Sequence, residues 1–109
     1  MRLAIIGSRT IFTFDLSPYI PEDVIEIVSG GALGIDTIAE NYAKKHQIPL
    51  KIFLPEYLKY GKPAPLIRNI AIVSYADKVL AIWDGKSRGT MYTVKEARKQ
   101  NKLLELIEV

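Results

Sequence analysis

The chain has 109 residues, of which 49% are hydrophobic and 25% charged, as in one globular domain and unlike a disordered segment. The absence of cysteine excludes disulfides, thiolate metal sites and cysteine nucleophiles. The net charge of +3 suits an anionic ligand but falls short of the dense basic footprint of a duplex-DNA-binding protein. Because no signal-like or membrane-spanning run is present, we expect a single cytoplasmic domain, residues 1–109, without membrane contact.

Five apolar runs alternate with segments of helical periodicity. The runs read as buried strands and cover 3–6, 24–28, 50–54, 78–83 and 103–109. Helices are predicted within 35–46, 66–75 and 90–100, one short helix within 12–19, and a long loop over 55–65. Strands that alternate with helices pair in parallel through right-handed crossovers. The sequence therefore predicts an α/β domain with a Rossmann-like, doubly wound parallel sheet of about five strands, in three α/β/α layers.

Unusual loops follow four of the strands, at the edge where open α/β sheets bind ligands. Their candidate ligand-binding residues are Gly7, Ser8, Arg9, Ser29, Gly30, Gly31, Gly34, Asp36, Arg68, Asn69, Asp84, Gly85, Ser87, Gly89 and Thr90. Glycine-rich turns at helix N-termini let backbone N–H groups approach an anion closely. The loops therefore predict a shared phosphate site, although neither glycine turn matches the dinucleotide fingerprint or the P-loop.

Within this site each residue type has an expected role. The turns 30–34 and 85–89 would hold phosphate, with Arg9 and Arg68 neutralising its charge. Asn69 would read a base or ribose edge. The hydroxyls of Ser29, Ser87 and Thr90 are candidate donors or helix caps.

Asp36 and Asp84 are the candidate ribose or catalytic contacts. The simpler alternative for Asp36 is a carboxylate favoured by the helix dipole, and for Arg68 a surface salt bridge. A Mg²⁺ ion bridging phosphate and Asp84 is a further alternative, without a cluster of ligand residues to support it. Residues 57–63 interleave tyrosines and lysines, as in a base-stacking lid or an ordinary exposed loop.

The same motifs resemble a known family. Gly7-Ser8-Arg9, the segment Ser29 to Asp36, Tyr60-Gly61-Lys62 with Arg68-Asn69, and the segment Trp83 to Thr90 together resemble the SLOG superfamily. The small YspA/YpsA-related branch, domains of unknown function, is the most similar. The resemblance implies a Rossmann-like fold and a role in sensing or processing nucleotide-derived ligands, often in phage-related or stress contexts. It also implies relatives that are often dimers, so a homo-oligomer is an alternative to a monomer.

Two related branches imply competing functions. LOG phosphoribohydrolases cleave the N-glycosidic bond of nucleoside monophosphates and carry Pro-Gly-Gly-x-Gly-Thr-x-x-Glu, where Thr93 stands here at the glutamate position. Such hydrolysis needs a carboxylate near the ribose. DprA binds single-stranded DNA and has a loop similar to Gly31-Ala32-Leu33-Gly34-Ile35-Asp36.

The sequence leaves four competing hypotheses of function. The first is binding of a phosphate-bearing nucleotide or derivative, as a sensor or a nucleotide-processing protein. The alternatives are single-stranded DNA binding, N-glycosidic hydrolysis, and an interaction module with a vestigial pocket.

Overall fold

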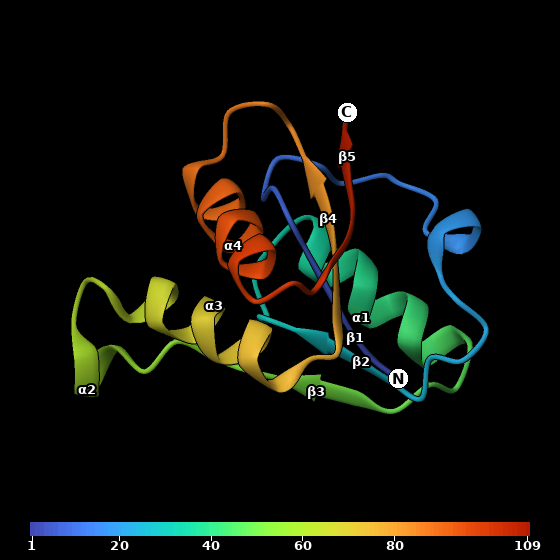
Figure 1. Ribbon diagram of the computed structural model, residues 1–109, viewed down its shortest axis with the longest axis horizontal. Coiled ribbons are helices and arrows are strands. Elements are labelled where there is room, and N and C mark those ends of the chain that lie inside the picture. Colours follow the sequence, from blue (N-terminus) through green and yellow to red (C-terminus); the bar gives the residue numbers. More distant parts are fainter.

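The apolar runs form one all-parallel sheet, as predicted. In the computed structural model, which describes all residues Met1–Val109, the strands lie in the order β3-β2-β1-β4-β5 (Figure 1). Their bounds are β1 (Arg2–Gly7), β2 (Glu26–Ser29), β3 (Leu50–Ile52), β4 (Lys78–Trp83) and β5 (Leu103–Glu108). β2 and β3 are shorter than expected, because Ile25 and Leu54 are exposed at 65% each and lie outside the paired segments.

Helices cover both faces of this sheet. The helices are α1 (Ile35–Lys45), α2 (Tyr57–Tyr60), α3 (Ala64–Tyr75) and α4 (Arg88–Lys99). α1 packs on one face, while α3 and α4 pack on the other (Figure 1). Successive residues of a strand point to opposite faces, so β1 sends Leu3 and Ile5 toward α1, and Ala4 and Ile6 toward α3 and α4. The predicted three-layer α/β/α architecture is thus confirmed.

Two connections differ from the prediction. The expected helix within 12–19 is only a 3₁₀ turn, η1 (Ser17–Tyr19), around Pro18. Its neighbours Phe14 and Leu16 join the core on the α1 side. The loop 55–65 contains α2, which ends at Gly61 (φ 68°), whose N–H donates to the Tyr57 carbonyl. A single turn of helix is too short to show periodicity in the sequence.

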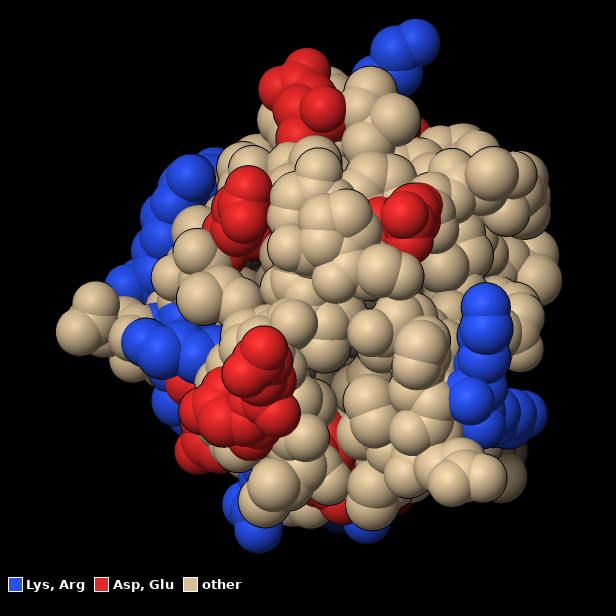
Figure 2. Space-filling view, turned by 90° about the vertical axis from the view of Figure 1, so that its right-hand side faces the viewer, with Lys and Arg blue, Asp and Glu red and all other residues tan.

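The surface carries no broad basic area on the face shown in Figure 2. Lys and Arg side chains lie at the margins of this face, and separate acidic side chains lie between them. None of the helices is both long and apolar enough to cross a lipid bilayer.

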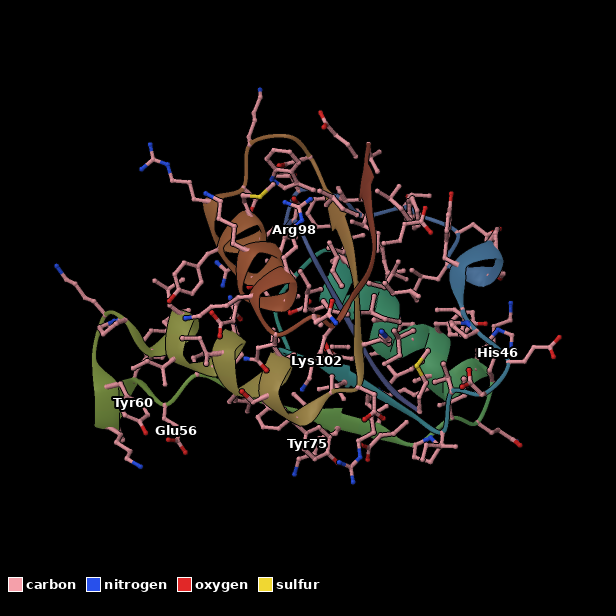
Figure 3. The ribbon with its side chains drawn as sticks, viewed as in Figure 1. His46, Glu56, Tyr60, Tyr75, Arg98 and Lys102 are labelled. Atoms are coloured by element: carbon pink, nitrogen blue, oxygen red, sulfur yellow. The ribbon has the colours of Figure 1, made fainter.

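The lysine after α4 caps a neighbouring helix. The Lys102 ammonium donates to the carbonyls of Val73 (2.9 Å) and Ser74 (3.1 Å), in the last turn of α3 (Figure 3). A cation there complements the negative end of the helix dipole. The contact ties the start of β5 to α3.

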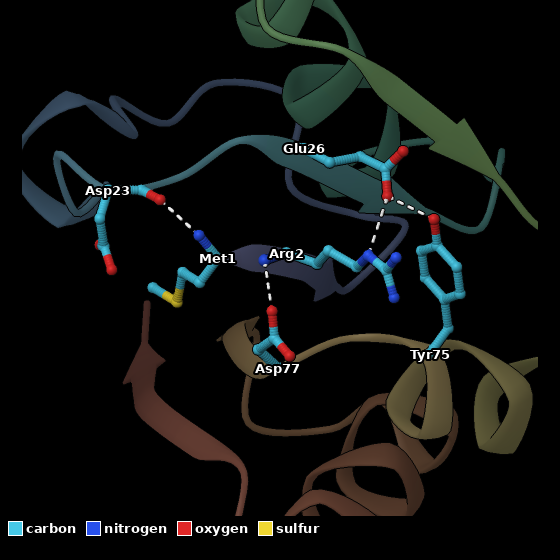
Figure 4. A network of polar contacts seen from close by, with 6 residues as sticks. All are labelled: Met1, Arg2, Asp23, Glu26, Tyr75 and Asp77. Carbon is cyan, nitrogen blue, oxygen red and sulfur yellow. Dashed lines mark hydrogen bonds and ion pairs between the residues drawn. The ribbon is translucent and has the colours of Figure 1, made fainter.

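A polar network closes the amino end of the sheet (Figure 4). The Tyr75 hydroxyl donates to Glu26 (2.6 Å), whose carboxylate also pairs with Arg2 at 3.8 Å. The Arg2 guanidinium lies 4.4 Å from the centre of the Tyr75 ring, and the Arg2 N–H donates to Asp77 (2.7 Å). These contacts join β1, β2 and the end of α3 at the amino end of the sheet.

Candidate ligand-binding site at the carboxyl edge

A cavity of about 340 Å³ lies at the carboxyl edge of the sheet, within the size range of small-molecule sites. It lies between the end of β1, the start of α1, the α2–α3 segment and the start of α4. Its lining consists of Ile6, Gly7, Arg9, Ala32, Asp36, Tyr57, Pro65, Leu66, Arg68, Asn69, Ile72, Ser87, Gly89, Thr90 and Thr93.

The structure brings about half of the predicted site residues together here. Those that line the cavity are Gly7, Arg9, Asp36, Arg68, Asn69, Ser87, Gly89 and Thr90. Those that lie outside its lining are Ser8, Ser29, Gly30, Gly31, Gly34, Asp84 and Gly85. The second set packs the loops and so determines where the first set lies.

The glycine turn before α1 is closely packed. A Cβ at Gly30 would lie 2.9 Å from both the Arg68 guanidinium and the Asp36 carboxylate. A Cβ at Gly34, which has φ +75°, would lie 2.5 Å from the Ser8 carbonyl. At Gly34 glycine is required, because backbone atoms occupy the space of a Cβ and φ is positive, whereas at Gly30 a Cβ would have to displace the ends of the Arg68 and Asp36 side chains.

Ser29 is a buried part of the same loop. Its hydroxyl donates to Glu40 of α1 (2.9 Å) and accepts from the Gly31 N–H (3.3 Å). The hydroxyl therefore fastens the turn to α1 and has no opening to the cavity.

Asp36 is the cavity's only carboxylate and is 6% exposed. Its Oδ2 accepts from the Ala32 N–H at 3.2 Å. Burial raises the pKa of Asp36 to about 6, while that hydrogen bond and the nearby Arg68 act in the opposite direction. The side chain can therefore exchange a proton close to neutral pH.

Arg68 of α3 joins three segments around the cavity. Its Nη1 donates to the carbonyls of Gly30 and Phe53 (3.3 Å for the second), and its Nε donates to Asn69 Oδ1 (2.7 Å). Burial lowers the pKa of Arg68, but a guanidinium remains charged at any physiological pH. Arg68 also lines the cavity, and its hydrogen bonds within the protein are made by Nε and Nη1. Arg68, predicted as a ligand-binding arginine, thus also connects α3 with the segments that follow β2 and β3.

The glycine turn at the N-terminus of α4 differs from the one before α1, because the space around its glycine is empty. Ser87 is the N-cap, and its Oγ accepts from the Thr90 N–H (3.3 Å) and lies 2.9 Å from Thr90 Oγ1. A Cβ at Gly89 would meet no atom within 4 Å. The first N–H groups of a helix have no acceptor within it, so those of Arg88 and Gly89 are free to bind an anion.

Asp84 has a different position from the one expected of a catalytic group. Its Oδ1 accepts from the N–H groups of Lys86 and Ser87 (both 2.8 Å), and its Oδ2 accepts from the Thr10 hydroxyl (2.7 Å). These hydrogen bonds, the Thr10 bond foremost, hold the pKa of Asp84 well below its usual range. Asp84 thus shapes the turn that presents Ser87 and Gly89.

Thr93 lies in the cavity wall and is 1% exposed. Its hydroxyl donates to the Gly89 carbonyl at 2.9 Å, so it is bound within α4. The chain's single histidine, His46, lies at the far end of α1, across the molecule from the segment of Glu56 and Tyr60 (Figure 3). The cavity lining thus contains one carboxyl group, that of Asp36, and no imidazole.

A bound cation would find few protein ligands at this site. No group of three or more His, Cys, Asp or Glu side chains is placed to hold a metal ion anywhere in the structure. Asp84, which the sequence offered for Mg²⁺, lies outside the cavity lining, and both of its oxygens already accept hydrogen bonds from the protein.

Sequence reasoning did not assign the apolar part of the lining, formed by Ile6, Ala32, Pro65, Leu66 and Ile72. These residue types carry no signal that separates a cavity wall from ordinary core. Residues 57–63 were expected to form either a base-stacking lid or an ordinary exposed loop. Of the two tyrosines in this segment, Tyr57 lines the cavity and Tyr60 does not.

Comparison of the chain with protein-family models, with curated proteins and with solved structures found no match. What is established is therefore the Rossmann-like α/β fold, with five parallel strands and interleaved helices.

Proposed function

We propose that the protein binds a phosphate-bearing nucleotide or nucleotide derivative in the cavity at the carboxyl edge of the sheet. One observation carries the proposal: the open N-terminus of α4 and two arginines, Arg9 and Arg68, face the same cavity. A helix N-terminus and guanidinium groups are complementary to phosphate in charge and in hydrogen-bond donors. A single carboxylate opposes them, so the cavity favours an anion.

The sequence resemblance to the small SLOG proteins supports the same proposal. The resemblance implies a role with nucleotide-derived ligands, and residues of the motifs Gly7 to Arg9 and Trp83 to Thr90 line this cavity. We include membership of that branch in the proposal.

Binding is tested by calorimetric titration of the purified protein with nucleoside mono- and diphosphates, ADP-ribose, cyclic nucleotides and a short single-stranded oligonucleotide. Arg9→Ala should weaken the binding of the preferred nucleotide by about 10-fold or more, as expected for a charged hydrogen bond. Arg9 is exposed, so its loss should leave the fold intact. The matched control is Arg98→Ala, an exposed arginine in the last turn of α4 (Figure 3).

The outcomes separate the competing functions. Equal effects of Arg9→Ala and Arg98→Ala would indicate general charge attraction and contradict a defined site. Binding of the oligonucleotide alone, with steep salt dependence, would favour a single-strand binding protein. No binding to any probe would favour an interaction module.

N-glycosidic hydrolysis is a second candidate function, favoured by one observation. Asp36 places a carboxyl with a pKa of about 6 in the cavity, and hydrolysis of a ribosyl bond needs a carboxylate near the ribose. Thr93 supplies none. Incubation with nucleoside monophosphates, followed by chromatography, should then show free base, which Asp36→Asn abolishes without loss of binding. Binding without release of base would identify a sensor.

A further inference from the structure

The cavity has a polar side and an apolar side. The polar side is formed by the N-terminus of α4 with Arg9 and Arg68. The other side is formed by Tyr57 of α2 with Pro65 and Leu66, at the start of α3. A phosphate uses only the first side, and inorganic phosphate or a bare polyphosphate would leave the second in contact with water.

Tyr57 is the only aromatic residue that lines the cavity, and its side chain is 55% exposed. Leu66 is 37% exposed. The chain reversal at Gly61 returns α3 alongside α2, and the Ala64 N–H donates to the Gly61 carbonyl (3.1 Å). An exposed ring from α2 and an exposed aliphatic side chain from α3 thus line the same cavity.

From this arrangement, and resting on the proposed function, we infer that the ligand class is a nucleoside phosphate whose base stacks on Tyr57. Phosphate binds at α4, and the base covers the Tyr57 ring and Leu66. A planar base is the part of a nucleotide that buries apolar surface, and every base has a face that can stack on an aromatic ring.

Asn69 has a fixed orientation at the same wall. Its Oδ1 accepts from Arg68 Nε (2.7 Å), so its amide N–H groups are left to donate. The base would therefore meet the ring of Tyr57 on its face and an amide donor on its edge. The other side of α2 differs, because Tyr60 lines a separate cavity of about 180 Å³ together with Phe53.

The test compares ribose 5-phosphate with the four nucleoside 5′-monophosphates, using calorimetry and amide NMR shifts of Gly89 and Thr90 as a report on the phosphate end. A base–aromatic stack predicts that the preferred nucleotide binds about 5- to 140-fold more tightly than ribose 5-phosphate. Tyr57→Leu should remove most of this preference and leave ribose 5-phosphate affinity unchanged. Tyr57→Phe should retain the preference because it keeps the ring.

The control is Tyr60→Leu, the same substitution on the same short helix but outside the cavity lining. It should retain the preference of the wild-type protein. If Tyr57→Leu also retains it while ribose 5-phosphate still shifts the Gly89 amide, the base lies elsewhere and only this inference fails. If neither ribose 5-phosphate nor any nucleotide shifts that amide in the wild-type protein, the proposed function fails, and the inference with it.

Discussion

The buried carboxyl of Asp36 should make the stability of the protein depend on pH in an unusual direction. Its pKa is about 6 in the folded protein and 3.8 as the ordinary value. The folded state therefore binds the proton more tightly than the unfolded state, and between these two values the folded state carries more bound protons. The contribution of Asp36 is fully present below its unfolded pKa and is lost as the pH rises through 6.

The shift of about two pKa units corresponds to about 3 kcal/mol in the free energy of unfolding. Urea unfolding of the wild-type protein, from about pH 4 to pH 7.5, should therefore include a loss of this order that is centred between the two pKa values. Asp36→Asn keeps an oxygen that accepts from the Ala32 N–H but cannot ionise. Its free energy of unfolding should lack this loss, so the variant should gain on the wild-type protein as the pH rises.

The control is Asp23→Asn, which removes an exposed carboxylate and should keep the wild-type pH profile. Asp84 acts in the opposite direction, because its pKa is lowered in the folded protein. Its contribution to stability is present above the unfolded pKa and is lost at more acidic pH, as the carboxylate becomes protonated. Parallel profiles for the wild-type protein and Asp36→Asn over the whole range would refute the assignment of a raised pKa to this side chain.

Four further substitutions, each studied by urea unfolding, test the packing described above. Gly34→Ala should lower the free energy of unfolding by about 2 kcal/mol or more, because its Cβ would clash with backbone at positive φ. Gly89→Ala should change the free energy of unfolding by less than about 1 kcal/mol, because the space around Gly89 is open. Equal effects of the two substitutions would contradict this contrast. Ser87→Ala should cost about 1 kcal/mol through loss of the α4 N-cap, and no change would show that the cap is dispensable. Tyr75→Phe should lower the free energy of unfolding by removing the hydrogen bond to Glu26, an effect that should disappear when Glu26 is also replaced by Ala, which has no acceptor.

The fold could be predicted because burial imposes a pattern on the sequence. Strands covered on both faces must be apolar at successive positions, and Leu3 to Ile6 and Val79 to Ile82 meet that condition with exposed fractions of 6% or less. The helical stripe of α1 is equally direct, since Ile35, Ala39 and Ala43 are fully buried. Parallel pairing then follows from the alternation of strands and helices, and it places the loops at one edge.

The division of roles at that edge could not be predicted in the same way. Gly30 and Gly89 are the same residue type in similar turns, but Arg68 fills the space beside Gly30 and nothing fills the space beside Gly89. Asp36 and Asp84 likewise follow strands in glycine-rich loops, and only Asp36 lines the cavity. These differences depend on contacts between residues far apart in the chain, on which local sequence carries no information.

The central position of β1 has a consequence for how the chain folds. Leu3 pairs with Ile27 of β2 on one side and with Lys78 of β4 on the other. The pairing of β1 with β2 closes a short loop, whereas the pairing of β1 with β4 must bring together residues about 75 positions apart in the chain. Closing so long a loop carries an entropic cost that slows the formation of parallel pairing. Until β4 docks, an apolar strand edge with free N–H and C=O groups stays open to other chains. Slow refolding with aggregation at high protein concentration is therefore expected, and substitutions in β4 should increase the aggregation more than equally destabilising ones in β3.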